Sequence, residues 1–217
     1  MAKHVLRAVV KPPRLGSALQ IAINNTTEKR LSVLMTPITS SAFDLAFSLV
    51  VNSPARKAPR SRLNALFNDL KQPEPSRDPD ETTDLIWAIW IDHRDEEASH
   101  RMAVALEAIA AGAKDLAKPI LDELVESHPD WAEAWNKRAT LAFIEKRDDE
   151  CIHDIAKTLA LEPRHFGAIL GFAQICMRHD RLEEAKAAFE VAQSLNPHIE
   201  GIEAVISELA AERQPLH

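Results

Sequence analysis

The side chains that most often do chemistry occur in this sequence without the spacing that a catalytic or metal site requires. Nine histidines are present, yet they form no HExxH motif and no i, i+4 pair accompanied by a carboxylate ligand. His128, His165 and His198 stand close to prolines, which favours roles in turns or at helix ends. The histidines therefore predict no metal site.

The other reactive groups indicate structure rather than catalysis. Cys151 and Cys176 are too few and too far apart for a metal site or a disulfide framework, and both fall on expected core faces. The pairs Asp148-Asp149 and Glu183-Glu184 begin expected helices, where negative charge is favourable. Since phosphate loops, Gly-x-Ser-x-Gly elbows and Cys-His signatures are also missing from the sequence, we predict no enzyme and no cofactor.

Composition points to a helical protein. The 217 residues are 46% hydrophobic and 27% charged, in the range of globular proteins. Five glycines and no tyrosine argue against a β-sandwich or barrel, which needs many turns and β-favouring aromatics. We expect an all-α fold.

Charge divides the chain into two parts. Residues 1–62 carry ten lysines and arginines against Glu28 and Asp44, which gives this segment a net charge of +8. Because the whole chain has a net charge of −7, the remaining residues carry −15. A basic, acid-poor segment of this kind is typical of a disordered leader or a degenerate targeting segment, which we assign to residues 1–60. The positive charges are scattered and lack aromatic partners for base stacking, so nucleic acid is not a favoured partner.

An apolar stretch runs from Leu31 to Val51. Pro37 and Asp44 interrupt it, which argues against a stable membrane span. Lys29 and Arg30 precede it, as in an export signal, although no clean cleavage site follows. The location therefore stays open between the cytoplasm and, if residues 31–51 act as a signal, the periplasm; contact with a membrane is expected only through these residues.

Two short helices follow the leader, within residues 61–95. Ser61 can cap the first, whose apolar side is formed by Leu63, Leu66, Phe67 and Leu70. Prolines 73, 75 and 79 end it. The second runs from about Thr82 to His93, and its apolar stripe contains Ile86, Ile89 and Trp90. We expect the two helices to cap the first turn of the structure that follows.

Three prolines then mark a repeat. Pro129, Pro163 and Pro197 stand 34 residues apart, and each interval contains a helix, a polar turn and a second helix. A fixed period of this kind indicates a solenoid, in which each unit buries its apolar side only against its neighbours. Core residues recur at the same places: Ala105, Ala139 and Ala173; Ala117, Cys151 and Ala185; Leu121, Ile155 and Phe189.

These units resemble the tetratricopeptide repeat (TPR) family, whose pattern is Trp-x2-Leu-Gly-x2-Tyr, then Ala-x3-Phe, then Pro. The middle unit matches it at Trp135, Ala139, Cys151, Ile155 and Pro163, with Arg138 in place of the usual Leu. The third unit matches at Ala185, Phe189 and Pro197, and the resemblance as a whole covers Ala98 to Ile199, as in small bacterial proteins of this kind.

The resemblance implies a right-handed superhelical solenoid. Three TPR units would occupy residues 96–199, as 98–131, 132–165 and 166–199, and a C-terminal capping helix would occupy 200–213. Ile202, Val205, Ile206 and Leu209 form the apolar stripe of that cap, and glutamates lie on its wet side.

In this family the first helices of successive units line a concave groove that binds peptides. Carried over by position, the groove would contain Ser99, Met102, Leu106, Ile109, Glu133, Asn136, Thr140, Phe143, Ile144, Leu170, Gln174, Met177 and Arg178. This mixture suits an apolar or amphipathic peptide. The family's carboxylate clamp is not expected, because Met102, Gly167 and Gly171 stand where it needs basic or amide side chains.

The sequence therefore predicts a non-enzymatic adaptor that binds a protein or peptide in the TPR groove. The alternative is an exported or membrane-associated envelope assembly factor, in which residues 31–51 deliver the same scaffold. A third possibility is nucleic-acid binding through the basic leader, which would weaken steeply with salt.

Overall fold

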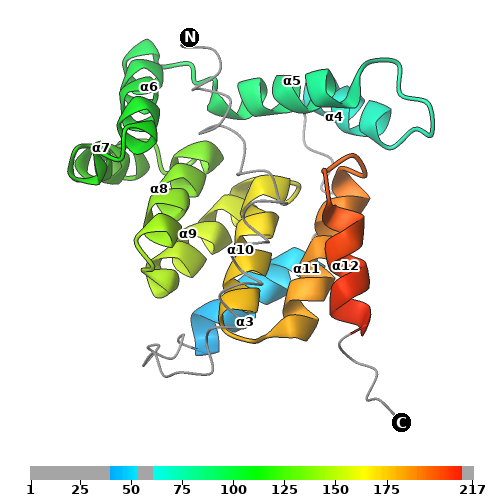
Figure 1. Ribbon diagram of the computed structural model, residues 1–217. Coiled ribbons are helices and arrows are strands. Elements are labelled where there is room, and N and C mark those ends of the chain that lie inside the picture. The colour runs from blue at the N-terminus through cyan, green and yellow to red at the C-terminus, as the bar shows by residue number, and fades with distance from the viewer. Residues whose placement is uncertain (1–39, 53–60, 212–217) are drawn as a thin grey trace.

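The computed structural model describes residues 40–52 and 61–211, and within these ranges all regular structure is α-helical (Figure 1). The helices are α3 (Ser40–Val51), α4 (Ser61–Leu70), α5 (Pro79–Ile91), α6 (Glu96–Ala110), α7 (Lys114–Ser127), α8 (Ala132–Ile144), α9 (Asp148–Leu161), α10 (Phe166–Arg178), α11 (Leu182–Leu195) and α12 (Ile202–Ala211). The predicted all-α fold is confirmed.

Helices α6 to α11 form three consecutive hairpins. Helix α6 packs on α7, α8 on α9 and α10 on α11, and each hairpin also contacts the next one along the chain. Helix α12 then packs on α11. Figure 1 shows these hairpins stacked in chain order from green to orange, followed by α12 in red, so the predicted solenoid of helical repeats is confirmed.

The turn inside each hairpin has the same geometry three times. Its left-handed residues are Gly112, Lys146 and Asp180, with φ of 73°, 59° and 59°. In each turn the next residue donates its N–H to a carbonyl five positions earlier, at 2.8 or 2.9 Å. These bonds satisfy carbonyls that the helix end would otherwise leave unpaired. The 34-residue period of the sequence therefore corresponds to a turn conformation that recurs in all three hairpins.

The second helices also end alike, because α7, α9 and α11 each stop two residues before a repeat proline. A proline lacks the N–H that would continue the helix. Of the expected core residues, Ala105, Ala117, Leu121, Ala139, Cys151, Ile155, Ala173, Ala185 and Phe189 are buried; Trp135 and Pro163 are partly exposed; Pro129 and Pro197 are exposed.

Arg138, which departs from the family pattern, is held by two acidic partners. Its Nε and Nη2 lie 2.7 and 2.8 Å from the carboxylate oxygens of Asp154 on α9, and its Nη1 lies 3.2 Å from Asp122 on α7. The hydrogen bond to Asp154 raises the pKa of the guanidinium. Where the repeat pattern has a leucine, Arg138 thus bridges carboxylates of α7 and α9, the second helices of two successive hairpins.

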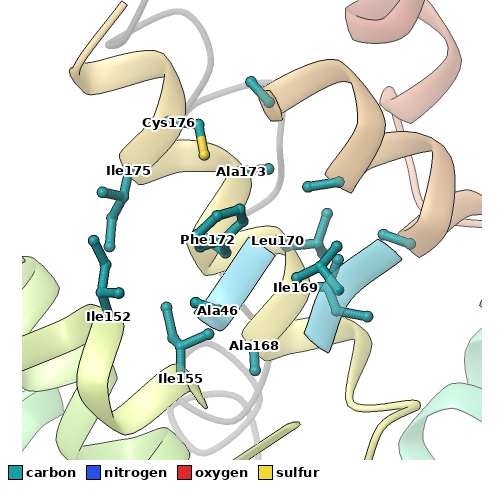
Figure 2. Close-up of a cluster of buried hydrophobic side chains, with 14 of the residues drawn as sticks. Ala46, Ile152, Ile155, Ala168, Ile169, Leu170, Phe172, Ala173, Ile175 and Cys176 are labelled. Atoms are coloured by element: carbon teal, nitrogen blue, oxygen red, sulfur yellow. The ribbon is translucent and has the colours of Figure 1, made fainter. Parts of the chain in front are cut away.

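Helix α3 comes from the segment predicted to be a disordered or targeting leader. Its Phe43, Ala46 and Val50 are buried in a cluster shared with α8 to α12, and its neighbours are α9 and α11. Ala46 lies among side chains of α9 and α10, beside Phe172 (Figure 2). Residues 40–51 therefore form part of the core, which periodicity alone did not indicate because this helix belongs to no repeat.

The other parts of the predicted leader, residues 1–39 and 53–60, lie outside the described residues, as does the end of the predicted C-terminal cap. Among the helices that are described, none combines the length and apolar character needed to cross a membrane.

Helices α4 and α5, here called the strap, differ in position from the expectation. Leu63, Leu66, Phe67 and Leu70 of α4 pack with Trp87 and Trp90 of α5 and with Phe166 at the start of α10. The strap therefore lies across the ends of the later hairpins, along the top of Figure 1, and does not simply cap the first one. Helix α5 begins at Pro79, three residues earlier than expected, because Asp78 caps it.

Candidate partner-binding face

The residues predicted to line the groove divide into buried and accessible sets. Met102, Leu106, Glu133, Asn136 and Leu170 are buried; Ser99, Ile109, Thr140, Phe143, Gln174, Met177 and Arg178 are partly exposed; Ile144 is exposed. In α8 and α10 the buried members lie in the N-terminal half and the accessible members in the C-terminal half. The two helix ends therefore have different roles.

A buried charge cluster occupies the N-terminal end of α8. Glu133 has 0% exposure; its Oε2 lies 2.7 Å from His165 Nε2, and its Oε1 lies 3.0 Å from Lys137 Nζ. Asn136 donates a further hydrogen bond to Oε2 at 3.1 Å. Glu133 and Lys137 are i, i+4 neighbours on one helix, while His165 comes from the loop before α10, so the cluster joins two hairpins.

His165 has a different partner at each ring nitrogen. Its Nδ1 accepts the N–H of Ala168 and caps α10, at 3.2 Å. Since Nδ1 accepts, we assign the proton to Nε2, which donates to Glu133. The ring also stacks on Trp90 of the strap, with centroids 4.1 Å apart and planes 16° apart.

The charges of this cluster compensate one another. Burial on its own raises the pKa of Glu133, but Lys137 and the hydrogen bond from His165 outweigh it, so the pKa lies below its usual range. Lys137 Nζ lies 4.9 Å from the centre of the Trp87 ring, which adds a cation–π contact. The Glu133 carboxylate therefore stays ionised although it is buried, and the cluster has a structural role.

The strap contacts the loops that connect α7 to α8, α9 to α10 and α11 to α12. Near the start of α5, Thr83 Oγ1 accepts a hydrogen bond from Asn196 at 3.1 Å. At the end of α5, the carbonyl of Trp90 accepts the indole N–H of Trp131 at 2.9 Å. The third contact of α5 is the stacking of Trp90 on His165. Because these partners precede or follow α8, α10 and α11, the strap closes the N-terminal ends of α8 and α10.

The fit between strap and solenoid is close at Gly167. A Cβ built there would lie 2.5 Å from the ring of Trp87, whereas one built at Gly171, a turn further along α10, would lie 3.7 Å from Ile155. Gly167 is therefore required by the approach of the strap, and Gly171 is not.

The C-terminal ends of α8 and α10 are more accessible. Ile144 is 44% exposed, and Phe143 and Met177 are partly exposed at the edge of the core. Arg178 lies over the Phe143 ring, 4.2 Å from its centre, and pairs with Asp148. Asp148 also lies 2.8 Å from His179 Nε2. This end presents apolar side chains beside charges that are already paired.

Reactive chemistry is not indicated in the described part of the chain. Burial raises the pKa of the Cys151 and Cys176 thiols above its usual range, which disfavours the nucleophilic thiolate. In the same part of the chain, no group of three or more metal-ligating side chains is gathered in one place.

The buried charge cluster was not predicted from the sequence. Glu133 and Lys137 have the spacing of an exposed helix pair, and this pair would look the same on a solvated face. A signal was present in Trp87 and Trp90, since a helix with two tryptophans must cover something apolar. What the sequence did not indicate is that these rings cover the loop before α10.

The comparisons with known proteins agree with the repeat geometry. The chain is similar to a TPR repeat-containing protein of Rhizobium etli, with 37% identity over 130 residues. The match covers 58% of this chain and 62% of that relative, so the chain spans less than two thirds of the relative's length. No family model matches the chain.

Proposed function

We propose that this chain, whose helical hairpins resemble tetratricopeptide repeats and which is similar to a TPR repeat-containing protein, is a non-enzymatic adaptor that binds a protein or peptide. The binding surface is the C-terminal half of the first-helix face, formed by Thr140, Phe143, Ile144, Gln174 and Met177 of α8 and α10. We call these five residues the open face.

One observation carries the proposal: the open face keeps apolar side chains at the surface. Ile144 is 44% exposed and Met177 is partly exposed, at positions that bind partners in related repeats. Methionine adapts its shape to different partners, which suits a recognition surface. An apolar group that stays exposed beside a well-packed core favours a contact with another chain.

The surroundings of the open face favour an apolar or amphipathic partner over a strongly charged one. Arg178 is paired with Asp148, and Arg147 with Glu145 and Glu150. Since these nearby charges have partners, they add little net attraction for an acidic or basic peptide. The partner is expected to supply large apolar side chains, with amide or hydroxyl contacts to Gln174 and Thr140.

Affinity capture with the full chain tests the proposal. The test variant combines Ile144→Glu and Met177→Glu, which places two charges on the open face. The matched control is Leu116→Glu, because Leu116 is also an exposed apolar residue, 54% exposed on α7. We expect the control and the wild type to recover the same partners and the test variant to lose them. Equal recovery by all three chains would contradict the open face.

Burial of α3 bears on the envelope-factor alternative. More than half of the stretch proposed to deliver the scaffold forms α3, and its Phe43, Ala46 and Val50 pack against the solenoid. This folded role favours the adaptor. N-terminal sequencing of the mature chain after cell fractionation separates the two, since cleavage beyond residue 39 would support export.

A further inference from the structure

We propose that the crevice between α9 and α11 is a second binding site, for an amphipathic helix of a partner protein, and that α3 occupies this site in the free protein. The site lies on the second-helix side of the solenoid, whereas the open face is formed by first helices. It therefore adds a separate interaction surface to the proposed function.

The contact between α3 and the crevice has the form of a bound helix. Phe43, Ala46 and Val50, at positions i, i+3 and i+7, have exposures of 0%, 0% and 1%. This spacing is the anchor pattern of helices that bind in grooves. The outward positions of α3 include Asp44 and Ser48, which are exposed. Ala42, Phe47 and Leu49 flank these anchors and are partly buried against the same core, so one broad apolar face of α3 makes the contact.

The crevice is shaped around the aromatic anchor. The Phe43 ring lies 5.0 Å from the ring of Phe172, centroid to centroid, at the floor of the crevice. The guanidinium of Arg181 also lies against the Phe43 ring, 3.4 Å from the ring centre. Phe43 therefore contacts both an aromatic ring and a cation, whereas the small Ala46 lies beside Phe172 (Figure 2). These contacts define the required ligand: an aromatic, a small and a branched aliphatic residue in one stripe.

Three features favour exchange of α3 over a permanent place in the core. It belongs to no repeat, so the hairpins can stack without it. A 12-residue helix is too short to be stable by itself. Its outer side also exposes Leu45 and Val51, at 56% and 43%, so α3 carries apolar residues that this site does not use. Since an empty crevice would expose Phe172, only a helix of similar chemistry can replace α3.

Hydrogen exchange on the wild-type chain gives the first test. If α3 leaves while the solenoid stays folded, its amides exchange at least about tenfold faster than the core amides of α9 and α11. Exchange of all three helices at one common rate would show that α3 opens only when the whole protein unfolds, and this would overturn the proposal without any substitution.

Peptide binding gives the second test. The probe is a fluorescent peptide with the sequence of residues 38–53, titrated into the full-length wild type and the full-length Phe43→Asp variant. We expect the variant to bind it at least about tenfold more tightly, because α3 of the wild type competes from within the same chain. A peptide with the same Phe43→Asp change serves as control and should not bind. Equal binding to both chains, or no binding to a variant whose circular dichroism shows it folded, would overturn the proposal.

Discussion

The two ends of helices α8 and α10 both carry charged pairs, but they differ in burial. At the N-terminal ends, the strap covers Glu133, Lys137 and His165 and keeps water out. At the C-terminal ends, the charged pair of Arg178 and Asp148 is partly buried beside accessible apolar groups. The comparison teaches that one repeat face can be covered at one end, where a buried charge cluster is held, and left accessible at the other.

The largest expected difference between the two ends concerns two glutamates. Glu133→Gln removes the charge that compensates buried Lys137, so we expect a loss of about 3 kcal/mol in the free energy of unfolding. Glu145→Gln, at the other end of α8, removes one partner of a partly exposed pair in which Arg147 keeps Glu150, and it should cost less than about 1 kcal/mol. Urea unfolding of both variants measures the difference, and equal losses would show that the N-terminal cluster is not sealed.

Two glycines of α10 test how closely the strap approaches. Gly167→Ala forces the Trp87 ring to move and should destabilise the protein by about 2 kcal/mol. Gly171→Ala meets only ordinary contact with Ile155, and removing a helix glycine should stabilise by about 0.5 to 1 kcal/mol. Thermal or urea unfolding shows whether each variant is more or less stable than the wild type. If Gly167→Ala also stabilised, the strap would not lie where we describe it.

Acid should weaken the closed end selectively. The pKa of Glu133 is lowered in the folded state, so its contribution is complete above the usual glutamate value of 4.5 and is lost as the pH falls through the lower folded pKa. The stability difference between the wild type and Glu133→Gln should therefore shrink as the pH is lowered from about pH 7 to below the usual glutamate pKa. A difference that stays constant over this range would contradict the assignment.

The smallest expected effect lies in the hairpin turns at the open end. Lys146 and Asp180 adopt the left-handed conformation that Gly112 adopts in the first hairpin. Replacing either by glycine should stabilise the protein by about 0.5 to 1 kcal/mol, because glycine pays no steric cost there. The two changes alter the net charge in opposite directions. Similar gains in both would therefore identify the backbone as the cause, and opposite signs would identify the charge.

The repeated part of this fold could be predicted from the sequence because its signals recur. Pro129, Pro163 and Pro197 mark the helix ends, and alanines such as Ala139 and Ala173 mark close packing at the same place in each unit. The 34-residue period then specifies neighbours, since each hairpin packs on the next. Local patterns that agree three times leave little freedom for the helix boundaries.

The parts that occur once could not be placed in the same way. Helix α3 and the strap carry clear apolar stripes, but a stripe does not say which surface it covers. The burial of Glu133 depends on Trp90, which is 43 positions earlier in the chain and stacks on Glu133's partner His165. The division of the groove into an open and a closed half therefore follows from tertiary contacts between elements that share no period.

Thiol labelling of two sites on α10 tests the difference between its ends most directly. Phe166→Cys and Met177→Cys place a cysteine under the strap and at the open end, and the native Cys151 and Cys176 are buried with disfavoured thiolates, so their background is low. In the folded full-length chain, Met177→Cys should react with a charged thiol reagent at least about a hundredfold faster than Phe166→Cys. Equal rates for the two sites would contradict a face that is closed at one end and open at the other.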